Sequence, residues 1–266
     1  MTERRYELLT RLGFRYGLNG PHAARTMMLD DLRVLLSHTQ LNASRADYVI
    51  AIVENNVLGK PTRKSRELAL RHMTALYDLD PVNPIFRAMR QLWALDEGAQ
   101  PMLALAVALA RDPLLRSTQE FILGLSPGAR VTRDAVEAFL GSTYPDRFSP
   151  ASLKSFSQNV AGTWTAAGHL LGHVRKSRAL PEARPESAAM LLFLGFLEGR
   201  SGQRLFTSEW VSLLCVSAEE FESLANSASH RGLLIFMNAG GVKEVRFPGY
   251  VTSEEEQIRQ EVAHVI

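Results

Sequence analysis

The chain has 266 residues, of which 46% are hydrophobic, and its 30 Lys and Arg side chains stand against 28 Asp and Glu. This apolar fraction supports a packed core and excludes a wholly disordered chain. The single cysteine, Cys215, excludes an internal disulfide and a Cys-rich zinc site. The longest apolar run, 101–110, is about half of the roughly 20 residues that a membrane-spanning helix needs, and no secretory signal is visible. We therefore expect a cytoplasmic protein that does not contact membranes.

Helix start and stop signals follow one another through the first half of the chain. Pro21 suits a first helical turn, and Ser44 can cap a helix that ends near Gly59. Thr62 can cap a strongly basic helix over 62–80. Further helices are expected after Pro84, over 102–110 and over 113–123.

The second half combines helices with short extended segments. Thr132 and Ser149 can each cap a helix, the second of which covers 149–167. Ser208 and Ser217 can each open another. Strands are expected mainly within 169–180, which reads as a short arm, and within 233–247, where Asn238 to Gly241 supply hairpin turn residues. An acidic helical tail is expected over 253–266.

These signals predict a mainly α fold, a multi-helical bundle with winged-helix-like units and one or two short β-hairpins. The two helix–loop–helix–extended units would cover about 132–180 and 205–248. The loop at 126–130 is the predicted boundary between an N-terminal helical domain, 1–126, and a C-terminal helical region, 127–266. The stretch 181–186 is an alternative boundary.

Three sequence motifs of nucleotide-binding proteins and metalloproteases are missing from the chain. It contains no GxGxxG, GxxxxGK[ST] or HExxH pattern. His169 and His173 stand four residues apart, but glycines flank both and no nearby carboxylate supplies a third metal ligand. We therefore expect no catalytic residues, no metal and no cofactor.

A first basic cluster opens the predicted helix 62–80. Between positions 60 and 71 it contains Lys60, Arg63, Lys64, Arg66 and Arg71, with one acid among them, Glu67. Such a cluster can contact successive phosphates, and the amides of a helix N-terminus can add donors. The alternative is a solvated basic face without a partner.

A second basic segment is free of acids from Arg147 to Pro181 and coincides with the first helix–loop–helix–arm unit. In a winged helix-turn-helix, a recognition helix enters the major groove and the following hairpin lies along the backbone. Helix 149–167 would be the recognition helix, because Gln and Asn can pair with adenine and Lys with guanine or phosphate. Its candidate DNA contacts are Lys154, Gln158 and Asn159, and those of the arm are Arg175, Lys176 and Arg178. The alternative is a buried structural helix followed by a basic loop.

The segment 55–66, NNVLGKPTRKSR, resembles the Asn-x-x-Leu-x-Lys-x-Ser/Thr, Arg-rich signature of the BrxA family of BREX bacteriophage-exclusion systems. The resemblance continues in register through QLWAL at 91–95, the helix 152–170 and the final RGL at 231–233. It implies a mostly helical fold, partly like that of NusB-type antitermination factors, which binds double-stranded DNA without known catalysis. Lys60, Arg63 and Arg66 match the basic signature best.

Together these observations predict a non-enzymatic DNA-binding component of a phage-defence system. Its partners would be double-stranded DNA and other proteins of that system. A protein–protein adaptor without nucleic-acid contact is the alternative, and a ligand-responsive transcription regulator is a third interpretation.

Overall fold

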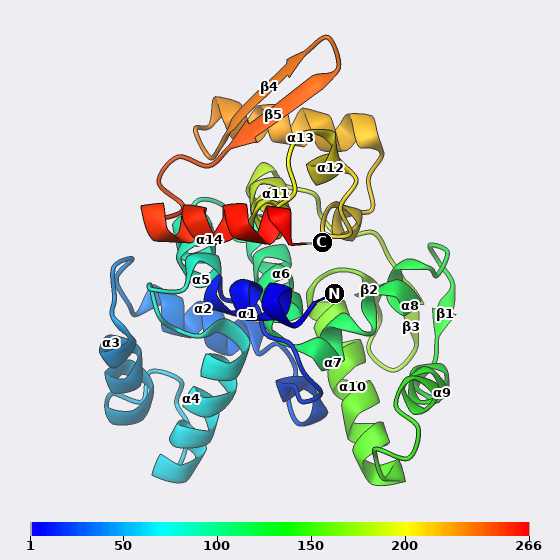
Figure 1. Ribbon diagram of the computed structural model, residues 1–266. Coiled ribbons are helices and arrows are strands. Elements are labelled where there is room, and N and C mark those ends of the chain that lie inside the picture. Colours follow the sequence, from blue (N-terminus) through cyan, green and yellow to red (C-terminus); the bar gives the residue numbers. More distant parts are fainter. Residues whose placement is uncertain (1, 266) are drawn as a thin grey trace.

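Helices dominate the computed structural model, which describes residues 2–265, and the strands form two small antiparallel sheets (Figure 1). The predicted mainly α fold with short hairpins is therefore confirmed. Within residues 2–265, no helix combines the length and the apolar character needed to cross a membrane.

Residues 2–129 are helical apart from their connections. Their α-helices are α1 (Glu3–Arg11), α2 (Leu29–Ser37), α3 (Arg45–Val49), α4 (Arg63–Tyr77), α5 (Pro84–Trp93), α6 (Gln100–Arg111), α7 (Pro113–Arg116) and α8 (Gln119–Leu123). Two 3-10 helices, η1 (Pro21–Ala23) and η3 (Glu97–Ala99), and one π-helix, η2 (Ile50–Glu54), join them.

The second half adds the strands. Its elements are β1 (Arg130–Val131), α9 (Arg133–Thr143), α10 (Pro150–Ala166), β2 (Leu170–Leu171), β3 (Lys176–Arg178), α11 (Pro185–Leu197), α12 (Gln203–Phe206), η4 (Val211–Leu214), α13 (Ala218–His230), β4 (Ile235–Ala239), β5 (Val242–Arg246) and α14 (Ser253–His264).

Local capping explains where several helices begin. The hydroxyls of Ser44, Thr62 and Ser217 each accept the backbone N–H three residues on, and the side chain at that position bonds back to the cap. Ser149 and Thr132 likewise cap α10 and α9. Each such cap contributes about 1 kcal/mol and confirms a start predicted from sequence.

Two buried helices form the centre of the molecule. Every residue of α6 from Met102 to Arg111 is buried, as is every residue of α11 except Phe196. Helix α6 packs against α4, α5 and α11, and α11 also packs against α13. One apolar core therefore includes residues from both sides of position 126, and the division at 126/127 stays a prediction.

Four predictions about helix starts, ends or continuity are wrong. Pro21 opens only the single turn η1, and the following α-helix starts at Leu29. Helix α4 ends at Tyr77 because the next two residues take positive φ angles. The predicted helix 113–123 is interrupted between α7 and α8, and the buried Ser208 opens no helix.

A small three-stranded sheet closes the α9–α10 region. The chain order is β1, α9, α10, β2, β3, and the order in the sheet is β1-β3-β2, with all neighbours antiparallel. The predicted arm at 170–180 therefore forms a β2–β3 hairpin. Strand β1 lies where a boundary loop was expected, and its partner β3 is more than forty residues further along the chain.

His169, at the end of α10, is a buried structural histidine. Its Nε2 lies 2.8 Å from the carbonyl oxygen of Leu213, and its ring meets that of Trp164 edge to face at 4.8 Å. His173 is exposed on the hairpin, so the two imidazoles do not form a pair. Among residues 2–265, no three His, Cys, Asp or Glu side chains gather where they could hold a metal ion.

The free energy of unfolding should fall as the pH drops from about 6.5 towards 4. Burial lowers the pKa of His169 from 6.5 to about 4. Between these pH values the unfolded chain binds a proton at His169 that the folded chain does not bind. The contribution of His169 to the free energy of unfolding is therefore complete above pH 6.5 and is lost on acidification. This one group can contribute at most about 1.4 kcal/mol per pH unit.

Urea unfolding at several pH values measures this effect. His169→Gln should show a shallower fall in unfolding free energy than the unmodified protein, whereas His173→Gln, at an exposed imidazole, should not. Equal slopes in all three proteins would contradict the assignment.

Candidate functional site

Three side chains hold α10 against the preceding helices. The Asn159 side-chain amide donates to the carbonyl oxygen of His22 at 3.1 Å. The indole N–H of Trp164 donates to the hydroxyl of Thr118 at 2.9 Å. The hydroxyl of Thr163 lies 2.8 Å from Nε2 of His22. Because all of these contacts lie on one side of the helix, they fix its orientation and leave the other side exposed.

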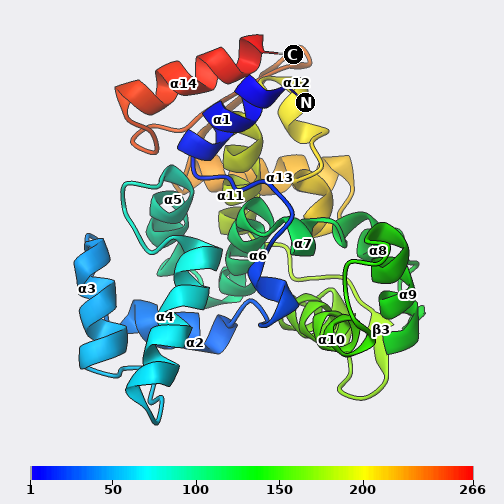
Figure 2. The same ribbon diagram turned by 60° about the horizontal axis from the view of Figure 1, so that its bottom comes forward.

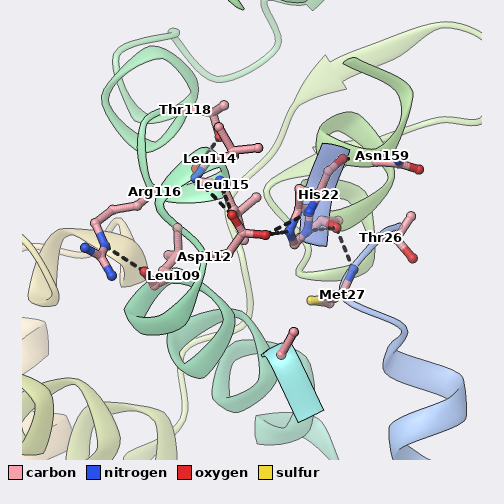
Figure 3. A network of polar contacts seen from close by, with 12 residues as sticks. His22, Thr26, Met27, Leu109, Asp112, Leu114, Leu115, Arg116, Thr118 and Asn159 are labelled. Atoms are coloured by element: carbon pink, nitrogen blue, oxygen red, sulfur yellow. Dashed lines mark hydrogen bonds and ion pairs between the residues drawn. The ribbon is translucent and has the colours of Figure 1, made fainter. Parts of the chain in front are cut away.

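The carboxylate of Asp112 anchors this arrangement (Figure 3). Its Oδ2 lies 2.8 Å from both the backbone nitrogen and Nδ1 of His22, and its Oδ1 accepts the N–H groups of Leu114 and Leu115. Burial opposes ionisation of Asp112, but these hydrogen bonds outweigh it and hold the pKa below its usual value. A Cβ at Gly20 would lie 1.7 Å from Oδ1, so only glycine fits there.

Thr163, His22 and Asp112 follow one another in the order of a hydroxyl–imidazole–carboxylate triad. In enzymes this order activates a nucleophile. Here all three residues are fully buried, and the backbone N–H of Met27 donates to the Thr163 hydroxyl at 2.9 Å. With Nδ1–H of His22 donating to Asp112, the Thr163 hydroxyl can donate to Nε2 and every hydrogen is paired. The triad therefore acts as a structural clamp, which we call the Asp112 network.

Ion pairs occupy much of the first basic cluster. The ammonium of Lys60 lies 2.8 Å from Asp31. The guanidinium of Arg63 pairs with Glu54 at 3.2 Å and with Glu67 at 3.0 Å. Both residues tie α4 and its leading loop to neighbouring elements, which reduces the charge that they offer to a ligand.

The same part of the surface carries three cations without carboxylate partners. The exposed Lys64, Arg25 and Arg71 take part in none of the ion pairs found among residues 2–265. Arg66 is half-buried and donates to the carbonyl oxygen of Val53 at 2.6 Å, so it mainly positions the start of α4. Arg25 was not predicted as a site residue, because a lone arginine in a loop forms no cluster in the sequence.

The three predicted cations of the β2–β3 hairpin have different surroundings. Arg175 is exposed, whereas Lys176 is half-buried and donates to Thr165 at 2.8 Å. Arg178, the third predicted DNA contact of the arm, is buried. It is 4% exposed, and its guanidinium donates to the carbonyl oxygens of Ile122 and His169 and to the sulfur of Cys215, which holds β3 in place.

On α10, Lys154 and Gln158 are exposed, and Lys154 takes part in no ion pair between described residues. Asn159 differs, because its amide already donates to the backbone of His22. Of the two amide side chains predicted to read bases, only Gln158 is therefore free to do so.

Two hollows flank the exposed side of α10. One, of about 500 Å³, lies between α2, α4 and α10 and includes Arg25, Lys60 and Ser65 in its lining. The other, of about 620 Å³, lies between α9, α10 and the β2–β3 hairpin. Gly162 and Ala166 line both, so a single stripe of α10 joins them.

Helices α4 and α10 project from the same end of the molecule in Figure 1, and Figure 2 shows the segment containing η1 between them. We call this surface, formed by α4, the loop after η1, the exposed side of α10 and the β2–β3 hairpin, the α4–α10 face. Its cations without carboxylate partners are Arg25, Lys64, Arg71, Lys154, Arg175 and Lys176.

No protein-family model and no curated protein matches the sequence. Among solved structures, a crystal structure of SspB superposes with a TM-score of 0.46 and 11% sequence identity, over 97% of this chain and 100% of that one. A likeness of this degree defines neither the fold nor the function of the chain.

The variant Thr163→Val should lower the free energy of unfolding by about 2 to 6 kcal/mol. It keeps the shape of the side chain but leaves Nε2 of His22 and the N–H of Met27 buried without partners, each at a cost of about 1 to 3 kcal/mol. Thr143→Val is the matched control, because Thr143 is exposed and its hydroxyl also bonds within its own helix. Urea unfolding of both variants provides the measurement, and equal losses would contradict the Asp112 network as a clamp.

Proposed function

We propose that this protein binds double-stranded DNA through the α4–α10 face, as a non-enzymatic component of a BREX-type phage-defence system. The observation that carries the proposal is the distribution of cations without carboxylate partners. Lys64, Lys154 and Arg175 are exposed on three neighbouring elements, and no ion pair has to be broken before they meet phosphates.

The order of elements around α10 supports the proposal. In a winged helix-turn-helix, two helices precede a hairpin, and the second helix enters the major groove. Here α9, α10 and the β2–β3 hairpin follow one another in that order, and β1 completes the sheet. Helix α10 takes the place of the recognition helix, and the hairpin takes the place of the wing.

The expected binding is mainly electrostatic. Lysine and arginine contacts to phosphates position a protein on DNA without reading its sequence, and they release counterions. Gln158 is the one amide on α10 that is free for a base edge, so sequence selectivity should be weak. A site of this kind acts in the cytoplasm, where the DNA of an infecting phage is found.

The resemblance to the BrxA family supports the assignment to phage defence. It rests on the segment 55–66, whose Lys60, Arg63 and Arg66 match the basic signature. These three side chains bond to Asp31, Glu67 and the carbonyl oxygen of Val53, and so fix the start of α4. Lys64, between them in sequence, is exposed and has no carboxylate partner among the described residues.

A protein–protein adaptor is the second candidate, and the β4–β5 hairpin favours it. Ile235, Met237 and Val242 are 41%, 44% and 74% exposed on this hairpin. The neighbouring α13 begins with an acidic turn that would repel phosphates. Contact with other proteins of the defence system would use this end of the molecule, away from the α4–α10 face (Figure 1).

Replacing Lys64, Lys154 and Arg175 together by alanine should weaken binding to a random-sequence duplex at least about tenfold. The slope of log affinity against log salt should flatten by up to about 3, since each phosphate contact contributes roughly 0.9. Fluorescence anisotropy at several salt concentrations measures both quantities.

Arg204→Ala is the matched control for the loss of charge. Arg204 is exposed on α12, outside the α4–α10 face, and takes part in no ion pair between described residues. Its replacement should leave affinity and slope unchanged. If the unmodified protein binds no duplex, or if the triple variant binds as well as the control, the DNA-binding proposal fails and the adaptor becomes the better account.

A further inference from the structure

The hollow between α9, α10 and the β2–β3 hairpin has the composition of a small-molecule site. Its volume of about 620 Å³ lies within the range of roughly 300 to 1,000 Å³ that is usual for ligand pockets. Apolar and polar groups meet in its lining, which includes Val131, Val136, Ala161, Gln158, Thr165 and Lys176.

Lys176 supplies the one positive charge of this lining that no carboxylate balances. Its ammonium has three donors, and two of them go to neutral acceptors, Thr165 at 2.8 Å and the carbonyl oxygen of Gly172 at 3.2 Å. The guanidinium of Arg133, the other strong cation of the lining, is paired with Glu137 at 3.0 Å. Lys176 thus retains one donor and a full charge for a ligand.

The neighbouring hydroxyl cannot take over this role. The Thr165 hydroxyl donates its hydrogen to the carbonyl oxygen of Ala161 at 2.6 Å, so it can only accept from Lys176. Burial already lowers the pKa of Lys176, which shows that its ammonium is partly removed from water. An anion at this point regains the interaction that the ammonium lost on burial.

We propose that this cavity binds a small organic anion, a carboxylate or sulfonate on an aromatic or branched apolar body. The anionic group pairs with Lys176, and the apolar body covers Ala161, Ala166 and Val174. The apolar part of the lining favours such a molecule over a bare phosphate, which would gain nothing from those three side chains.

Ligand binding at this cavity would also affect the proposed DNA contact. It neutralises Lys176 and occupies space beside Gln158, between the helix and the hairpin. This consequence rests on the proposed function, whereas binding of the anion does not, so the test uses the protein without DNA.

Two fluorescent probes of nearly equal shape test the proposal. Anilinonaphthalene sulfonate carries an apolar body and a negative charge, and N-phenyl-1-naphthylamine is its uncharged counterpart. Titrated into the intact protein, the sulfonate should bind with one site and at least about tenfold more tightly than the neutral probe, and benzoate should displace it. Equal affinity for the two probes, or no binding of the sulfonate, would overturn the proposal.

Variants then locate the probe. Lys176→Met should weaken sulfonate binding at least about tenfold, Lys176→Arg should restore most of it, and Ala161→Leu should reduce the binding of both probes by filling the cavity. Arg204→Met removes an exposed cation on α12, outside this lining and outside the α4–α10 face, and should have no effect. If Lys176→Met and Ala161→Leu bind like the unmodified protein, the probe occupies another apolar surface, such as the β4–β5 hairpin, and the proposed site is wrong.

Discussion

The buried carboxylate of Asp112 is the group on which the position of α10 depends. It accepts hydrogen bonds from the start of α7 and from His22. The other ring nitrogen of His22 bonds to the hydroxyl of Thr163 in α10. These groups have no contact with bulk solvent, because the three side chains are fully buried. A buried polar group without a partner costs about 1 to 3 kcal/mol, so the network is stable only when it is complete. Gly20 lies so close to the Asp112 carboxylate that any side chain at this position would clash with it, so the network also requires a glycine here.

This clamp determines what the opposite side of α10 can do. Its inward side is used by Asn159, Thr163 and Trp164, which leaves Lys154 and Gln158 on a helix whose orientation is fixed. If DNA binds here as proposed, the entropic cost should be small, because α10 is already held in place and few side chains have to be ordered on binding. The same arrangement creates the cavity at Lys176, since the β2–β3 hairpin packs against α10 through the Lys176–Thr165 contact. Structure, proposed DNA contact and proposed ligand site thus share one helix.

Local signals predicted much of the fold, and longer-range interactions determined the rest. Thr62, Ser149 and Ser217 act as caps because a cap needs only the next few residues, and the hairpin at 235–246 forms around its turn residues. Helix α11 was not predicted, although it is buried on almost all sides like the predicted helix over 102–110. The Asp112 network joins residues far apart in the chain and leaves no motif. The sequence also does not show which cations lack a carboxylate partner. Asp31 and Glu54, which pair with Lys60 and Arg63, lie outside the first basic cluster in sequence.

Hydrogen–deuterium exchange of the intact protein, with and without a random-sequence duplex, tests the central claim most directly. The account predicts slower exchange within 62–72 and 150–178, which belong to the α4–α10 face, and unchanged exchange within 218–246, which contains α13 and the β4–β5 hairpin. Protection confined to 218–246, or no protection anywhere at saturating duplex, would contradict the claim that the α4–α10 face binds DNA.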